Sequence, residues 1–134
     1  RWLGHDFNGM LPSEIFKKHS LACYVTDQTA LKVRHDIGMD IIAWECDYPH
    51  SDAIWPNAPE FVHAEMGNVG IPDDEMNKIL YQNSARFFGI DPFKHISKED
   101  ATVGALRASS PDVSTEIRSK HEWRKLYDLA HAPK

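Results

Sequence analysis

The chain has 134 residues, a net charge of −5, and 42% hydrophobic and 26% charged residues, which is the composition of one folded domain. Its Lys and Arg residues are scattered and outnumbered by Asp and Glu. This excludes nucleic acid as the expected partner, because phosphate binding needs clustered basic side chains. Since no apolar run is long enough to cross a bilayer and no signal peptide is recognisable, we expect a cytoplasmic protein with no membrane partner.

The two cysteines, Cys23 and Cys46, form no CxxC pair. Such sparse cysteines predict reduced thiols that are buried as small apolar residues, in keeping with a cytoplasmic setting. The chain begins Arg1-Trp2-Leu3 without Met. We therefore expect it to be an internal portion of a longer protein.

In chain order, the residue patterns predict mostly helices. We expect helices over residues 28–37, 60–66, 71–89, 97–107 and 111–130. Residues 12–18 could open a short helix, but turn-type residues dominate that stretch. The caps of these helices are Asp27, Ser97 with Asp100, and Ser110 before Pro111 at the starts, and Gly38 and Gly89 at the ends. The predicted buried faces are Met76, Ile79, Leu80 and Phe87 in one helix and Trp123, Leu126, Tyr127 and Ala130 in the last.

Two apolar segments, residues 21–26 and 41–44, predict short strands on either side of the helix over 28–37. The second has no polar alternation, as a strand buried on both faces should. Strand, helix and strand in fewer than thirty residues make a βαβ unit, so we expect an α/β fold with parallel strands. Because two parallel strands are not a self-sufficient sheet, we expect further strands from outside this sequence or from another chain.

The loop after the second strand contains Glu45, Asp47, His50 and Trp55. In barrel enzymes the carboxyl ends of parallel strands hold the catalytic groups, and a carboxylate there can bind a divalent metal or take a proton from metal-activated water. Asp47 suits both roles, and its alternative is to cap a turn before Pro49, which residue type and spacing alone favour. His50 could be a ligand, a proton donor or a structural hydrogen-bonding residue.

Three motifs together resemble the amidohydrolase-related family of metal-dependent hydrolases and decarboxylases, which includes aminocarboxymuconate semialdehyde decarboxylase. IIAWECDYPHSDAIWP (41–56) is similar to the last barrel strand and its loop, LPSEIF (11–16) to a segment ahead of the penultimate strand, and NSARFFG (83–89) to the end of the last barrel helix. The resemblance covers about residues 10–92.

This resemblance implies the C-terminal part of a (β/α)8 TIM barrel. Residues 1–92 would form the last βαβα part and residues 93–134 a helical extension. Asp47 occupies the position of a metal ligand or proton shuttle, with zinc the first expectation and manganese the alternative. A complete barrel needs about 250 residues, and the family's HxH pair and further histidine ligands are absent from this sequence. We therefore expect this chain alone to be inactive and to bind no metal.

One departure from the family concerns the residues before Asp47. A small Gly-Ser pair is usual there, whereas this chain has Glu45 and Cys46. Glu45 could share a strand face with Asp47, and could add a ligand, alter substrate preference or point away. We therefore place Glu45, His50 and Trp55 as candidates for a substrate pocket, with packing of the loop as the alternative for Trp55.

The resulting hypothesis is a fragment of an enzyme that hydrolyses or decarboxylates a small carboxylate or cyclic substrate, as a homo-oligomer. Its rival is a non-catalytic, mainly helical interaction module. Four other polar candidates are better explained by a structural role than by a functional one. His5–Asp6 and His35–Asp36 would be solvated or capping pairs, Asp52 a loop acid, and Asn83 a hydrogen-bond donor to backbone.

Overall fold

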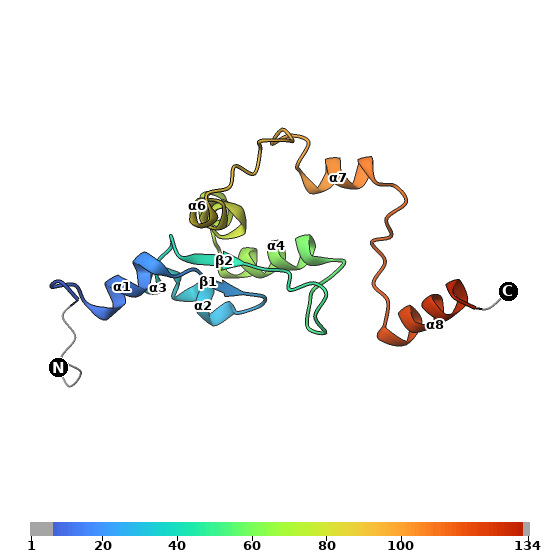
Figure 1. Cartoon of the computed structure of the whole chain (residues 1–134), viewed down its shortest axis with the longest axis horizontal. Coiled ribbons are helices and arrows are strands. Elements are labelled where there is room, and N and C mark those ends of the chain that lie inside the picture. Colours follow the sequence, from blue (N-terminus) through green and yellow to red (C-terminus); the bar gives the residue numbers. More distant parts are fainter. Residues whose placement is uncertain (1–6, 133–134) are drawn as a thin grey trace.

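Two short parallel strands form the centre of the fold. In the computed structural model, which describes residues 7–132, β1 (Ala22–Tyr24) pairs with β2 (Ile42–Trp44), and Ala22 lies opposite Ile42 (Figure 1). Both strands lie within the predicted segments and run parallel. The mixed α/β class is thereby confirmed.

Helices make up most of the rest of the described chain. They are α1 (Pro12–His19), α2 (Gln28–Lys32), α3 (Arg34–Ile37), α4 (Ala58–Val69), α5 (Asp73–Asn77), the π-helical turn η1 (Lys78–Gln82), α6 (Asn83–Phe88), α7 (Val103–Ser109) and α8 (Lys120–Ala130). Each strand is followed by helix, as the βαβ pattern predicted, and α2 packs on α4.

The core joins one face of the sheet to the helices. Its buried members are Leu31, Ile42, Val62, Met66, Ile71 and Ile79. Tyr24 and Trp44, which are opposite each other in the sheet, pack against this cluster. Because side chains alternate along a strand, Cys23 and Ala43 face the other side. Cys23 is exposed, so the prediction of a buried thiol there is wrong, while Cys46 is half-buried.

The helix predicted over 28–37 is broken in two. Val33 separates α2 from α3 with φ −103° and ψ 19°, outside the helical range. Val33 is 42% exposed, and a β-branched residue of this kind gains little from continuing a helix. Gly38 does end the helix as predicted, with φ 121° and ψ 111°, which is a positive φ outside the left-handed helical conformation.

The helix predicted over 71–89 begins at Asp73 and ends with Gly89 in the left-handed conformation, at φ 65°. Its middle is the π turn η1. The wider hydrogen-bonding of a π turn shifts the following residues out of phase with a 3.6-residue stripe. Ile79 is fully buried, but Phe87 is 47% exposed, so the prediction that Phe87 belongs to the buried face is wrong.

The last two helices start later than predicted. Ser97 and Asp100 do hydrogen-bond each other, but α7 is capped by Thr102 and α8 by Ser119, whose hydroxyl and backbone form a capping box with Glu122. Residues 111–118, with β-branched Val, Thr and Ile, remain outside any helix. The start predicted at Pro111 is therefore wrong.

Helix α8 is held apart from the body by an extended connection (Figure 1). None of the principal packings between elements in residues 7–132 involves it. Trp123, Leu126 and Tyr127, predicted as a buried face, are 44%, 42% and 63% exposed. That prediction is wrong, because no element in the described part of the chain covers the apolar stripe.

The structure does not test every sequence prediction. The predicted His5–Asp6 pair lies outside the described residues. Within residues 7–132, every helix is too short or too polar to cross a bilayer.

Candidate functional site at the end of the second strand

Asp47 stands where the chain leaves the sheet. The backbone N–H of Glu45 donates to the carbonyl of Tyr24 at 2.9 Å, which extends the strand pairing one residue beyond β2. Asp47 then adopts the left-handed conformation, with φ 57°, which Asp tolerates better than most residues. The N–H of His50 bonds the carbonyl of Asp47 at 2.9 Å and closes a turn. The carboxylate is thus fixed at the carboxyl end of a buried strand.

The structure brings Asp47 and His50 together through their side chains as well. His50 Nδ1 lies 2.8 Å from Asp47 Oδ1. This hydrogen bond, and after it the charge of Asp47, raises the pKa of His50, and the charges of Asp52 and Glu45 add to the effect. The Asp47 side chain is 28% exposed and that of His50 is 71% exposed. The pair can therefore exchange a proton with a molecule that approaches from solvent.

Glu45 is exposed and lies close enough to Cys23 of β1 for its charge to act on the thiol. Burial and, after it, the negative charge of Glu45 raise the pKa of the Cys23 thiol. Cys23 is therefore held in its protonated form, which is a poor nucleophile and a poor metal ligand.

Trp55 is packed against another aromatic residue of the same loop. The rings of Trp55 and Tyr48 meet edge to face, with centroids 5.7 Å apart, and are 46% and 67% exposed. The sequence identified Trp55 but not Tyr48. The signal available was their position on either side of a Pro-containing turn, which favours contact between bulky side chains.

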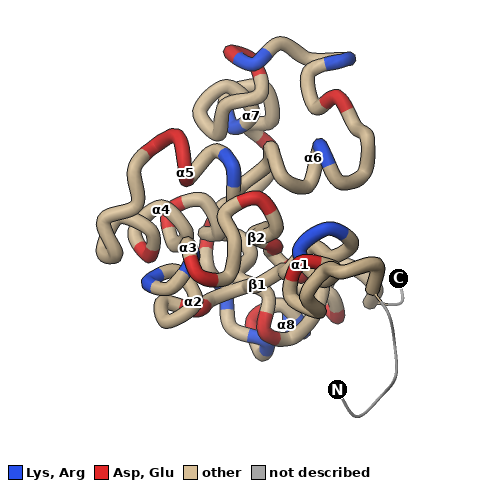
Figure 2. Tube along the Cα trace, turned by 90° about the vertical axis from the view of Figure 1, so that its left-hand side faces the viewer, with Lys and Arg blue, Asp and Glu red and all other residues tan. Residues whose placement is uncertain are grey.

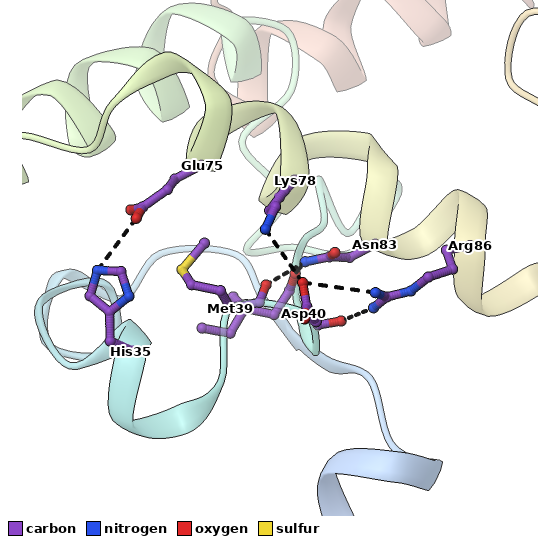
Figure 3. A network of polar contacts seen from close by, with 8 residues as sticks. His35, Met39, Asp40, Glu75, Lys78, Asn83 and Arg86 are labelled. Atoms are coloured by element: carbon purple, nitrogen blue, oxygen red, sulfur yellow. Dashed lines mark hydrogen bonds and ion pairs between the residues drawn. The ribbon is translucent and has the colours of Figure 1, made fainter.

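A polar network secures the opposite end of β2 (Figure 3). Asn83 donates to the carbonyls of Met39 and Ile42 at 2.7 and 2.8 Å, as the sequence predicted for a backbone-binding role. Arg86 donates to the carbonyl of Asp40, and the Asp40 carboxylate lies 3.6 Å from Lys78 and 3.8 Å from Arg86. These contacts bind η1 and α6 to the start of β2, and so position the strand that leads to Asp47.

One buried polar cluster was missed from the sequence. Glu65 on α4 is 4% exposed, and its Oε1 accepts from the Thr26 hydroxyl at 2.7 Å. The buried hydroxyl of Tyr24 has no hydrogen-bond partner among the described residues, and its pKa is raised by burial first and by Glu65 and Asp27 after it. Glu65 lies three residues after buried Val62, a spacing that could have identified it as core-facing.

The described residues hold no complete metal site. Within residues 7–132, no three His, Cys, Asp or Glu side chains converge on one point. Comparison with the known protein families and with curated proteins finds no match to this chain. The function must therefore be argued from the site itself.

Proposed function

We propose that this chain is the C-terminal part of a metal-dependent enzyme with a (β/α)8 barrel of the amidohydrolase type. The observation that carries the proposal is the position of Asp47, which sits at the carboxyl end of a buried parallel strand with its carboxylate 2.8 Å from the imidazole of His50. Barrel enzymes place their catalytic groups at this end of their strands. The two strands of this chain would be the last two, and the others would come from outside it.

The Asp47 carboxylate fits a divalent metal as one ligand of several. It is a short acid, partly open to solvent and held by two backbone constraints. Zinc is the first expectation and manganese the alternative, with the remaining ligands supplied by the missing strands. Such an ion, when bound, lowers the pKa of water and polarises a substrate oxygen.

The chain's own residues then move and hold the proton. For a hydrolase, Asp47 accepts the proton of the attacking water, and His50, whose raised pKa favours its charged form, stabilises the carboxylate and can donate to the leaving group. For a decarboxylase, Asp47 handles the proton that replaces carbon dioxide on the ring. Glu45 and Trp55 would line the approach of a small carboxylate or cyclic substrate.

Turnover of the full-length protein tests this role. Asp47→Asn keeps the size of the side chain but removes its charge, and we expect a loss of about 100-fold or more in kcat. Asp52→Asn, in the same loop, is the matched control and should retain kcat within about threefold, since a solvated loop acid makes only a weak electrostatic contribution. Equal turnover in the Asp47 variant and the unmodified protein would rule out the role.

A second candidate function is a non-catalytic interaction module. The observation in its favour is the exposed apolar stripe of α8, which could bind a protein partner without any metal or substrate. The two functions are compatible if α8 mediates assembly of the enzyme.

A further inference from the structure

Helix α8 has an apolar stripe on which no helix or strand of residues 7–132 packs closely. Leu126, Tyr127 and Ala130 lie three, four and seven residues after Trp123, so all four share one face of the helix. All four are exposed. Burial of such an aromatic stripe is strongly favourable, because Trp and Tyr contribute large areas of contact at low entropic cost. This face is suited to docking.

The polar residues beside the stripe on the side of Tyr127 are basic, while Glu122 borders its other side. Lys120 and Arg124 flank it on the side of Tyr127, and Arg118 stacks over the Trp123 ring at 5.2 Å. Residues 118–134 contain five Lys or Arg and two Asp or Glu, whereas residues 1–117 contain ten and eighteen. The helix is therefore a basic element attached to a strongly acidic body.

The body offers a surface of the complementary kind. Residues 45–77 contain eight Asp or Glu and no Lys or Arg. Within this stretch, Glu45, Tyr48, Asp52 and Trp55 are exposed in the loop after β2. We call these four residues the acidic loop surface. It combines exposed aromatic rings with negative charge, which matches an aromatic and basic helix face. The acidic run that opens α5, in red in Figure 2, adds to the negative charge of the body as a whole.

We propose that α8 docks on the acidic loop surface of a second copy of this chain, so that two copies exchange their C-terminal helices. The extended connection before α8 carries it away from its own body (Figure 1), which favours a contact between copies over one within a copy. An anionic membrane is disfavoured as the occupant because it would repel the acidic body. The inference stands without the enzymatic function. Where both hold, Glu45 and Trp55 lie under the docked helix and do not line the approach of the substrate.

Sedimentation velocity of the whole chain should show a dimer. Concentrations up to about 0.1 mM suffice, because they exceed the Kd of a specific interface. Trp123→Ala should weaken the dimer about 30-fold or more, as expected for a central aromatic anchor. Arg124→Glu should weaken it about fivefold or more, because an attraction becomes a repulsion. Lys125→Glu makes the same charge change on the far side of the helix from the stripe, and should leave the Kd within about twofold.

A charge exchange identifies the surface and shows that it belongs to another copy. Asp52→Lys should weaken the dimer as Arg124→Glu does. Mixing the Arg124→Glu chain with the Asp52→Lys chain should restore a dimer of the two, because α8 of the second chain then meets an unmodified loop of the first. Helix content by circular dichroism should be the same in all variants, since these side chains are exposed.

Four outcomes would overturn the proposal. They are a monomer at every concentration, a dimer that is indifferent to Trp123→Ala, variants that do not recover on mixing, and binding of a monomer to phosphatidylserine vesicles through α8. If the mixed variants do not form a dimer and the fluorescence of Trp123 is quenched in the monomer, α8 docks on its own body instead.

Discussion

The side-chain amide of Asn83, 2% exposed, donates a hydrogen bond of 2.8 Å to the carbonyl of Ile42, 41 positions earlier in the chain. A second hydrogen bond reaches the carbonyl of Met39 at 2.7 Å. Asn83 is the first residue of α6, so these two hydrogen bonds hold α6 against the start of β2, the strand that leads to Asp47.

Asn83→Ala should therefore lower the free energy of unfolding by about 2–3 kcal/mol, because two buried hydrogen bonds are lost and a small cavity is left. Urea unfolding followed by circular dichroism measures this. Gln82→Ala, a change at the exposed neighbouring residue, should cost less than about 0.5 kcal/mol. Equal costs for the two variants would contradict the role of Asn83.

The ion pair of Arg34 with Glu75 should make a measurable contribution to stability. Arg34 Nε lies 2.6 Å from Glu75 Oε2, and the two side chains are only 13% and 17% exposed. Glu75→Ala leaves the half-buried guanidinium without its partner, and we expect a loss of about 2 kcal/mol after allowance for partial solvent screening. Asp74→Ala, next to it on the exposed side of α5, should change the unfolding free energy by less than about 0.5 kcal/mol in the same urea titration.

Removal of the Tyr24 hydroxyl should be harmless or stabilising. The hydroxyl is buried without a hydrogen-bond partner among the described residues, so its desolvation is not offset. Tyr24→Phe keeps the ring and should leave the free energy of unfolding unchanged or raise it by up to about 1 kcal/mol. A loss of more than 1 kcal/mol in thermal or urea unfolding would show that the hydroxyl has a partner that stabilises the fold.

The His50–Asp47 pair predicts a pH dependence with a definite sign. Because the Asp47 hydrogen bond and charge raise the pKa of His50 above its ordinary value of 6.5, the folded protein binds the proton more tightly than the unfolded chain. The contribution of the pair to stability is complete below pH 6.5 and is lost as the pH rises through the raised pKa. NMR titration of His50 should give a pKa that falls towards 6.5 in Asp47→Asn and changes less in Asp52→Asn. An unchanged titration curve in Asp47→Asn would show that the pair does not form.

Much of the central fold could be predicted from residue patterns. The two parallel strands, the stop at Gly89 and the backbone-binding role of Asn83 all depend on local rules, namely apolar runs, a left-handed glycine and a buried amide. These rules need only neighbouring residues. A structural hydrogen bond was one of the alternatives predicted for His50, and its partner, Asp47, lies within the same turn.

The features that could not be predicted depend on longer-range geometry. The π turn η1 changes the helix phase without a sequence signal and so exposes Phe87. The bond between Glu65 and Thr26 joins residues 39 apart. The exposed face of α8 has the pattern of a core helix, because a periodic stripe shows that a face prefers burial and not what buries it.

The most direct measurement for the central claim is the metal content of the full-length protein by elemental mass spectrometry. Purified Asp47→Ala protein would be compared with Asp52→Ala protein, which loses a carboxylate five residues away in the same loop. We predict a divalent metal, zinc first, in the unmodified and Asp52→Ala proteins, and a loss of about tenfold or more in metal affinity in Asp47→Ala. No divalent metal in the full-length protein, or full occupancy in Asp47→Ala, would contradict the assignment of Asp47 as a metal ligand.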